Sequence, residues 1–378
     1  MHNWLAGTAQ EGFSFPMLIR IALLFLIVGS SFSAGAAARN VILVTLDGAR
    51  TQEIFRGLDV PTWQEQNKDQ KAEETDLHRK FWASTPEARR ERLLPFFWGT
   101  LMKNHGAIVG DRFNGSVMKL SNRHRFSYPG YSEILTGRAN DREIDSNSKI
   151  YNPRTTVLEW LKGELRLGPN QVAAFACWDV MDYIVMKEPG AIASNAGFEE
   201  YASADPAVAA LSRLQFATPT PWNSVRHDVY TFRFAMDHLK THRPRVLYLS
   251  LGETDDWAHD KRYDRVIEAL HRSDGYFREL WEWLQSQDDY RDQTTVLFAT
   301  DHGRGDDPLN WQHHNDKLDG AAFVWLAAAG KGVTKRGNLT PTAEYSQDQI
   351  SGTLLHALGI DASRYSPEAG KPVELFFK

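Results

Sequence analysis

The sequence of 378 residues contains only one cysteine, Cys177, so no intramolecular disulfide can form. Cys177 lies in the apolar run 171–178, where a buried structural thiol is expected rather than a nucleophile. Without a second cysteine the chain also has no cysteine-rich metal site. Scarcity of cysteine alone does not fix the compartment.

The chain also lacks a basic tract, an internal repeat and a Pro/Gly-rich linker. Its formal charge is −5, with 42% hydrophobic and 24% charged residues, as in ordinary globular proteins. This balance gives no reason to expect a nucleic-acid polymer as partner. The absence of a linker predicts one domain over residues 39–378.

No hydrophobic run is long enough for a comfortable membrane span. The apolar segment 21–29 follows a short basic start at 17–20 and precedes the small-residue stretch 30–38. This order is typical of a secretory signal peptide, with cleavage after Ala36 or Ala38. An uncleaved N-terminal anchor is the alternative.

The signal peptide is assigned to residues 1–38, although residues 1–16 fit its pattern poorly, which makes Met17 a candidate for the true start. In either case we expect the body of the protein to be exported, into a periplasm or out of the cell.

Long runs of β-branched and apolar residues alternate with segments of helical periodicity. This alternation predicts an α/β fold with a doubly wound, mostly parallel sheet and helices on both faces. The charge-rich stretch 51–92 is interpreted as helices and loops over the strand ends, forming at most a small cap. The expected strands are 40–46, 171–177, 245–251, 294–300 and 321–327, and the clearest helices are 155–165, 225–242 and 263–287.

Acidic and histidine residues follow three of these strands. Asp47 ends the first, the segment 253–259 follows the third, and Asp301 ends the fourth. Because ligands of open α/β sheets bind at the carboxyl ends of the strands, we expect these side chains to converge.

Each feature alone has a structural explanation. A single Asp after a strand is often a helix N-cap, and Asp255 with His259, spaced i, i+4, can be a solvated pair. Together, three carboxylates and three imidazoles form a mixed N/O set that suits Zn²⁺ better than Ca²⁺ or Mg²⁺. The set comprises Asp47, Asp255, His259, Asp301, His302 and either His313 or His314.

The ordered motifs resemble the alkaline phosphatase superfamily, particularly its type I phosphodiesterase/nucleotide pyrophosphatase branch. The matching segments are 44–50, 126–137, 255–259 and 300–303, and the tail 348–360 resembles the helix that closes that fold.

This resemblance implies two divalent metal sites, zinc being preferred and manganese the alternative. It places one ion on Asp255, His259 and His314, with His313 as the rival of His314. It assigns the other ion to Asp47, Ser127, Asp301 and His302.

Ser127 stands where the family carries its nucleophile. It lies in a turn-rich segment before the helical run 131–136, so its hydroxyl is expected near a helix N-terminus, where anions are favoured. A simple N-cap or turn serine is the structural alternative. The resembled branch more often has Thr here, and Asn where this chain has Gly130, and this departure argues against nucleotide diesters.

The implied function is hydrolysis of a small phosphate ester, monoester or diester, through a phosphoserine intermediate. Arg50 is the candidate for binding the nonreacting phosphate oxygens, because its fork matches them bidentately. Arg123, Arg125 and Arg138 are rivals, and a surface salt bridge is the alternative role of each.

Three other functions share part of this pattern. A sulfatase would share the fold, but its nucleophile needs Arg four residues later, where this chain has Tyr131, and its metal is Ca²⁺ on oxygen ligands. A phosphomutase-like phosphotransferase conflicts with export. A noncatalytic zinc-binding protein would not need the nucleophile. The oligomeric state has no signature in the sequence.

Overall fold

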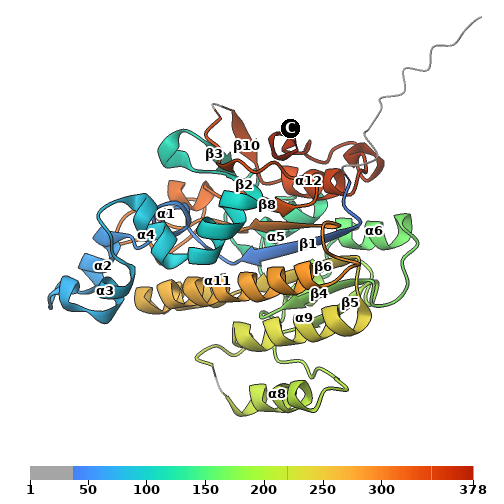
Figure 1. Ribbon diagram of the computed structural model, residues 1–378, viewed down its shortest axis with the longest axis horizontal. Helices are drawn as coiled ribbons and strands as arrows, with labels where there is room; N and C mark the ends of the chain where they lie inside the picture. Colours follow the sequence, from blue (N-terminus) through green and yellow to red (C-terminus); the bar gives the residue numbers. More distant parts are fainter. Residues whose placement is uncertain (1–36, 219, 342, 378) are drawn as a thin grey trace, which may run out of the picture. The chain divides into compact units, whose positions relative to one another are not determined.

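An eight-stranded sheet forms the centre of the computed structural model, which describes residues 37–218, 220–341 and 343–377 (Figure 1). The signal-peptide prediction lies outside the described residues except for positions 37 and 38. The strand order is β5-β4-β6-β1-β7-β8-β2-β9. The strands are β1 (Asn40–Leu46), β2 (Gly106–Val109), β4 (Val172–Ala176), β5 (Ala193–Ala196), β6 (Val246–Leu251), β7 (Thr294–Ala299), β8 (Leu326–Gly330) and β9 (Gly337–Asn338).

Parallel pairing dominates this sheet. β1 pairs with β6 and β7 in parallel, and β4 and β5 extend the same direction. Only β8 runs against its neighbours β7 and β2. Two further short strands, β3 (Val117–Lys119) and β10 (Glu344–Ser346), pair separately. The predicted doubly wound, mostly parallel fold is confirmed.

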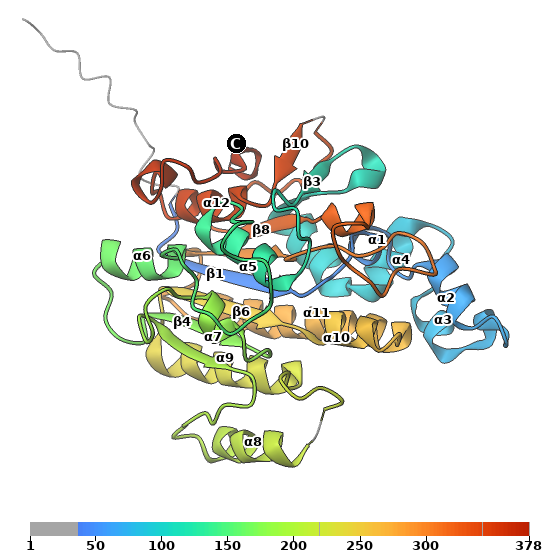
Figure 2. The ribbon, with the colours of Figure 1, turned by 180° about the vertical axis from the view of Figure 1, so that it is seen from behind.

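The two faces of the sheet are covered by different helices (Figures 1 and 2). Ile42 and Val44 face a core that includes α9 (Asp228–His242) and α11 (Tyr263–Ser286). Val41 and Leu43 face the opposite core, built with α5 (Ser127–Thr136), α6 (Val157–Glu164) and α12 (Gln349–Ala357). Because successive strand residues point to opposite faces, an uninterrupted apolar run fills both cores.

The stretch 51–92 forms four short helices directly after β1, together with the 3-10 turn Ala72–Glu74. They are α1 (Thr51–Arg56), α2 (Val60–Gln66), α3 (Asp76–Phe81) and α4 (Pro86–Leu93). The remaining helices are α7 (Met181–Ile184), α8 (Pro206–Ala217) and α10 (Glu253–His259). A π-helix (Phe97–Met102) and the 3-10 turns Arg112–Asn114, Asp319–Ala322, Ala362–Arg364 and Glu374–Phe376 complete the elements.

The strand expected at 321–327 was misplaced. Asp319–Ala322 is a 3-10 turn, and β8 begins only at Leu326. The backbone of this segment bonds elsewhere: Ala321 O accepts from Gly303 N, and Ala322 O accepts from Leu120 N. The backbone of the apolar residues before Leu326 therefore forms hydrogen bonds with the strand-end loops and does not join the sheet.

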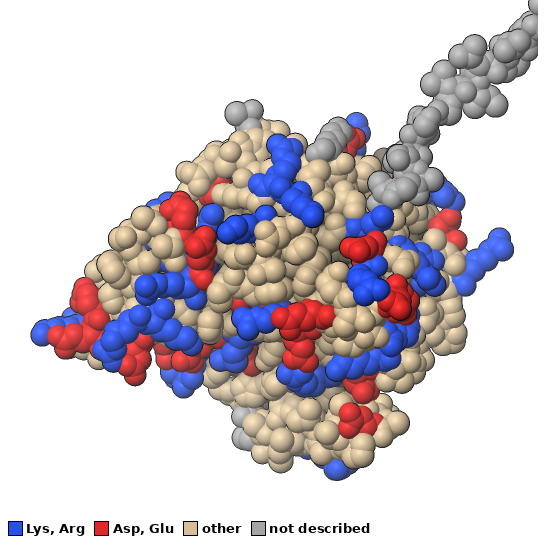
Figure 3. All heavy atoms as spheres, in the orientation of Figure 1, with Lys and Arg blue, Asp and Glu red and all other residues tan. Residues whose placement is uncertain are grey.

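Cys177 is buried directly after β4, as expected for a structural thiol. In the described part of the chain, no helix is both long enough and apolar enough to cross a membrane. On the face shown in Figure 3, positive and negative side chains are interspersed along α11, whereas the surface of α8 is mostly uncharged.

Candidate active site

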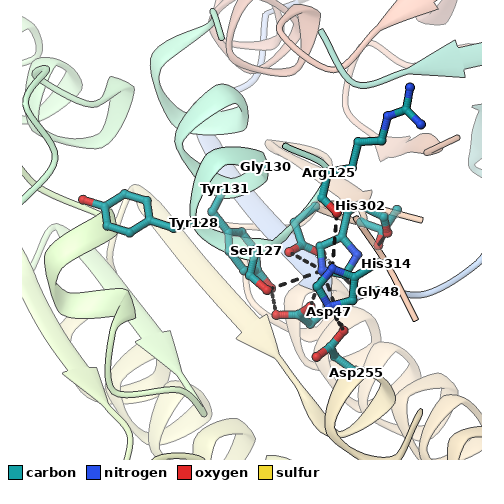
Figure 4. Close-up of polar contacts among 12 residues, drawn as sticks. Asp47, Gly48, Arg125, Ser127, Tyr128, Gly130, Tyr131, Asp255, His302 and His314 are labelled. Atoms are coloured by element: carbon teal, nitrogen blue, oxygen red, sulfur yellow. Dashed lines mark hydrogen bonds and ion pairs between the residues drawn. The ribbon is translucent and has the colours of Figure 1, made fainter. Parts of the chain in front are cut away.

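The carboxyl ends of three neighbouring strands lie close together. β6, β1 and β7 are adjacent in the sheet, and Asp47 follows β1 while Asp301 follows β7. The helix α10 begins after β6 and carries Asp255 and His259 on one face. The structure thus brings these predicted ligands together, and Figure 4 shows Asp47 and Asp255 beside His302 and His314.

Asp47, Asp301 and His302 form one group, whose ligand atoms all lie within 4.8 Å of one another. His302 Nε2 lies 3.3 Å from Asp47 Oδ1 and 3.5 Å from Asp301 Oδ2. The other oxygens are held by the protein: Gly48 N donates to Asp301 Oδ1 at 3.0 Å, and Tyr131 OH donates to Asp47 Oδ2 at 3.0 Å.

A second group consists of Asp255, His302 and His314, so His302 lies between the two. His259 is partly exposed at the rim, with its Nε2 3.1 Å from Asp255 Oδ2 and 3.0 Å from His314 Nε2. His314 is within this cluster, whereas the side chain of His313 is exposed.

Backbone carbonyls orient two of the imidazoles. The Nδ1 of His302 is 2.9 Å from Gly303 O, and the Nδ1 of His314 is 3.2 Å from Arg125 O. Donation from Nδ1 leaves the Nε2 lone pair of each ring free for a metal. Burial and the neighbouring His302 lower the pKa of His314, which favours the neutral imidazole that metals bind.

The electrostatics of the cluster fit bound cations. One oxygen of each carboxylate is buried without a hydrogen bond, namely Asp47 Oδ1, Asp255 Oδ1 and Asp301 Oδ2. Burial and the charge of Asp47 raise the pKa of Asp301 well above its usual range. Burial alone would lower the pKa of His302, but Asp301 and Asp47 raise it to about 9. Since buried acceptors need partners, divalent ions suit this donor set.

Ser127 is the first residue of α5, so the helix begins four residues before the run expected from the sequence. Its Oγ lies 3.4 Å from His302 Nε2. The approach to the helix is constrained, because Arg125 has a left-handed backbone with φ of 56°. The side chain of Arg125 points away from the site (Figure 4).

A cavity of about 320 Å³ opens in front of this cluster. Ser127 and four residues of the Asp/His cluster line it together with Asn147, Trp178 and Val225. The complete lining is Asp47, Ser127, Asn147, Trp178, Ser224, Val225, Gly252, Asp255, Asp256, His259 and His314.

Asn147 was not identified from the sequence. Its Oδ1 accepts from Tyr128 N at 3.0 Å, which holds the side-chain amide beside Ser127. Because Pro129 has no N–H and Tyr128 N–H is used in this way, the N-terminus of α5 offers an anion fewer backbone donors than expected. The amide nitrogen of Asn147 can supply a donor in their place.

Close packing fixes the position of α5. A Cβ at Gly130 would lie 2.3 Å from Asp301 O, so the helix backbone touches the strand-end loop directly. The buried Gln347 donates to both Gly130 O at 2.8 Å and Asp301 O at 2.9 Å. These contacts set the spacing between α5, which carries Ser127, and the Asp/His cluster.

Gly48 and Arg304 support the other side of the site. Gly48 has φ of 58°, and a Cβ there would lie 2.7 Å from both Arg304 Nε and Asp255 Oδ1. Arg304 is buried, pairs with Asp255 and donates to Gln312 O at 2.6 Å. Arg304 has no signature in the sequence beyond its place directly after the 300–303 motif.

The structure does not bring Arg50 to the cavity. Its guanidinium is buried against Glu53, with Nε 3.0 Å from Oε2, and NH1 donates to Gly305 O at 3.1 Å. Arg138 pairs with Glu368, and Arg125 donates to Leu318 O at 2.9 Å. Neither these three residues nor Arg123 lines the cavity.

Comparison with known proteins defines the fold. No protein family profile and no curated protein sequence matches the chain. Among solved structures, wild-type alkaline phosphatase PafA has a TM-score of 0.55 at 11% identity, over 90% of this chain and 99% of its own. The lipoteichoic acid synthase LtaP from Listeria monocytogenes has a TM-score of 0.55 at 10% identity, over 90% and 76% of the two chains.

A 2-O GAG sulfatase is also similar, with a TM-score of 0.51 at 10% identity, over 90% of this chain and 74% of its own. The chain therefore shares the fold of a solved alkaline phosphatase, which is the fold that the motifs predicted. Phosphatase and sulfatase chemistries share this fold, so the activity must be argued from the site.

Proposed function

We propose that the protein is an exported two-metal hydrolase of phosphate esters with Ser127 as its nucleophile. One observation carries the proposal: the Ser127 hydroxyl lies among three carboxylates and three imidazoles, and Asp47 and Asp301 each keep one buried oxygen that receives no hydrogen bond. Such an arrangement needs cations to be stable and places a hydroxyl beside them.

We assign the ligands of the two ions from the positions of the donor atoms. Asp255, His259 and His314 would hold one ion, and Asp47, Asp301, His302 and Ser127 Oγ the other. The mixed nitrogen and oxygen donors favour zinc, with manganese as the alternative. When bound, the two ions lower the pKa of the serine hydroxyl and neutralise charge on the phosphoryl oxygens.

The residues of the chain then perform two displacements. Ser127 Oγ forms a bond to phosphorus while the bond to the leaving alcohol oxygen breaks. A water oxygen next bonds to phosphorus, the bond to Ser127 Oγ breaks, and phosphate or its monoester leaves. The packing of Gly130 on Asp301 keeps Ser127 Oγ in place through both steps.

Asn147 is the donor that we assign to a nonreacting phosphoryl oxygen. Its amide is fixed by Tyr128 N–H, so little side-chain freedom is lost when it binds the substrate. It takes the role that Arg50 was expected to have, because Arg50 is committed to Glu53.

The site favours phosphoryl over sulfuryl chemistry. At the position where a sulfatase needs Arg, the hydroxyl of Tyr131 donates to Asp47 Oδ2 and receives a hydrogen bond from Ser250 Oγ at 3.2 Å. Tyr131 thus positions a metal ligand. The histidine-rich donor set also differs from an all-oxygen calcium site.

The proposal is tested by assaying the purified protein on aryl phosphate monoester, aryl phosphodiester and aryl sulfate, with and without chelator. We expect turnover of at least one phosphate ester, abolished by chelator and restored by zinc or manganese. Turnover of the sulfate alone would disprove phosphate ester hydrolysis, and turnover that resists the chelator would disprove the metal mechanism.

Export through a cleaved signal peptide belongs to the proposal. Ala38 is buried and its N–H donates to Ala357 O at 2.7 Å, so cleavage after Ala36 keeps this contact while cleavage after Ala38 removes it. We therefore favour Ala36, and mass spectrometry of the mature N-terminus checks it.

A further inference from the structure

Two carboxylates of the Asp/His cluster each have one oxygen that the protein itself occupies. Tyr131 OH donates to Asp47 Oδ2 at 3.0 Å, and Gly48 N donates to Asp301 Oδ1 at 3.0 Å. Among the described residues, the other two oxygens, Asp47 Oδ1 and Asp301 Oδ2, are buried and have no hydrogen-bond partner. Each carboxylate therefore offers a cation one oxygen and not two.

The spacing of the free donor atoms suits an ion with four ligands. His302 Nε2 lies 3.3 Å from Asp47 Oδ1, 3.5 Å from Asp301 Oδ2 and 3.4 Å from Ser127 Oγ. Four donors at the bond lengths of zinc form a tetrahedron with edges of about 3.3 Å. An octahedral ion with bonds of about 2.1 Å places neighbouring donors about 3.0 Å apart and needs two more of them. Asp301 and His302 are fully buried, which leaves little room for water to supply these.

Only one of the two blocking donors is a side chain, because Gly48 acts through its backbone N–H. Tyr131 is buried and lies four residues after Ser127 on α5, so both residues face the Asp/His cluster from the same side of the helix (Figure 4). A phenol is protonated at neutral pH and donates a hydrogen bond without bringing a charge. Asp47 thus keeps its negative charge for the ion.

A chain of buried hydroxyls fixes the orientation of the Tyr131 hydroxyl. Ser250 Oγ donates to Tyr131 OH at 3.2 Å. Ser250 is also hydrogen-bonded to Tyr248, whose hydroxyl lies 3.0 Å from Thr45 Oγ1. Thr45, Tyr248 and Ser250 are all buried. Because the Tyr131 oxygen accepts from Ser250, its own proton is directed to Asp47.

We propose that Tyr131 is a positioning residue that restricts Asp47 to a single metal-binding oxygen and so makes this position select a four-coordinate ion over a six-coordinate one. The inference rests on the ligand assignment of the proposed function and names the residue behind its preference for zinc over manganese. Without the phenol hydroxyl, both oxygens of Asp47 are free to bind one ion, which adds a ligand that a six-coordinate ion needs.

Tyr131→Phe tests the proposal, because it removes only the hydroxyl. The dissociation constants of zinc and manganese are measured by competition with a chromogenic chelator. We expect the preference for zinc over manganese at the more affected of the two sites to fall about tenfold or more. Zinc binding weakens as it does when other residues that orient metal ligands are lost. Manganese binding does not weaken, because Asp47 Oδ2 becomes available to it.

Cobalt(II) reports the coordination number directly and requires no turnover. Four-coordinate cobalt absorbs visible light far more strongly than six-coordinate cobalt, because its geometry lacks a centre of symmetry. The cobalt-loaded wild type should therefore show an intense visible band, and Tyr131→Phe should lose part of that intensity at equal cobalt content.

Tyr128→Phe is the matched control. Tyr128 is also buried on α5, but its hydroxyl donates to Ile150 O and not to the Asp/His cluster. The same loss of a hydroxyl there should leave the preference for zinc and the cobalt spectrum unaltered. Ser250→Ala removes the hydrogen bond that orients Tyr131 OH, so it should shift both measurements in the direction of Tyr131→Phe, by a smaller amount.

An unchanged preference for zinc together with an unchanged cobalt spectrum in Tyr131→Phe would overturn the inference. The proposed function is judged separately, by the metal content and the turnover of the wild type. If Tyr131→Phe does not fold, Ser250→Ala decides the question, and the absence of any shift in that variant would equally overturn the role of Tyr131.

Discussion

Among the described residues of the cavity wall, Ser127 is the only one with a hydroxyl that contacts the Asp/His cluster, with its Oγ 3.4 Å from His302 Nε2. Ser127→Ala removes one of the atoms expected to bind a metal ion, while the carboxylate and imidazole ligands remain. We expect turnover to fall by at least about 10³-fold, as for other enzyme nucleophiles. Metal content, measured by inductively coupled plasma mass spectrometry, should remain about two ions per chain. Retained turnover would exclude Ser127 as the nucleophile.

His313 and His314 provide a matched pair of adjacent residues. His314 lies 3.8 Å from Asp255 Oδ1 through its Nε2, while His313 is exposed. His314→Ala should therefore lose about one of two ions and reduce activity by about 10²-fold or more, whereas His313→Ala should retain both. The same metal analysis on both variants decides the assignment, and the opposite ranking would exchange their roles.

Residue by residue, the members of the Asp/His cluster were easier to predict from the sequence than the residues that support the cluster. Asp47, Asp255 and Asp301 could be found because each follows a recognisable strand. Asn147 and Gln347 could not, because each acts through contacts with backbone atoms distant in the sequence, which leave no local pattern. Arg50 lies outside the cavity lining because Glu53, three residues on, binds its guanidinium, a contact that sequence spacing does not reveal.

At the scale of elements, α5 is tied to the loop before it by a buried acid. Glu133 accepts from Ser121 N and Asn122 N, each at 2.8 Å, and this loop leads into Ser127. Burial raises the pKa of Glu133 from 4.5 to about 7, although these hydrogen bonds oppose the shift. The folded protein therefore holds a proton on Glu133 between pH 4.5 and about 7 that the unfolded chain releases.

The proton held by folded Glu133 determines the direction in which stability changes with pH. As pH rises from about 4.5 to about 7, Glu133 lowers the free energy of unfolding, by at most about 1.4 kcal/mol per pH unit. Glu133→Gln lacks this term, so its loss of stability relative to the wild type should be largest near pH 5 and smaller near pH 7. Urea unfolding of both proteins across this range checks the trend. A difference that grows with pH would show that folded Glu133 is ionised.

Long elements were predictable and short ones were not. The central strands β1, β6 and β7 were located within a residue or two, because buried runs of six or seven mostly apolar or β-branched residues leave little choice. Four-residue strands such as β2 and β5 carry too little periodicity to be recognised. The error at β8 arose because the apolar residues before it bond to strand-end loops.

For the whole molecule, the metal-type cluster joins segments from residue 47 to residue 314. Bound ions would cross-link β1, β6, β7 and α5, so their removal should destabilise the entire domain. We expect chelator to lower Tm by about 5–10 °C, because before chelation the metal concentration is well above the dissociation constants of both sites. Scanning fluorimetry with chelator and then with added zinc checks this, and Asp301→Asn should show a smaller shift. An unchanged Tm would contradict the presence of tightly held ions.

The contact of Gly130 with Asp301 has a consequence for how this protein could change. Where main chain rests on main chain, no side-chain replacement can adjust the gap, so we expect the distance from the Ser127 hydroxyl to Asp301 to be common to every variant that still folds. New substrates would have to be accommodated at other lining residues, such as Trp178, Ser224 and Val225, which lie on loops that tolerate exchange. Directed evolution of this protein should thus collect its mutations around 178 and 224–225 and leave 127–130 untouched.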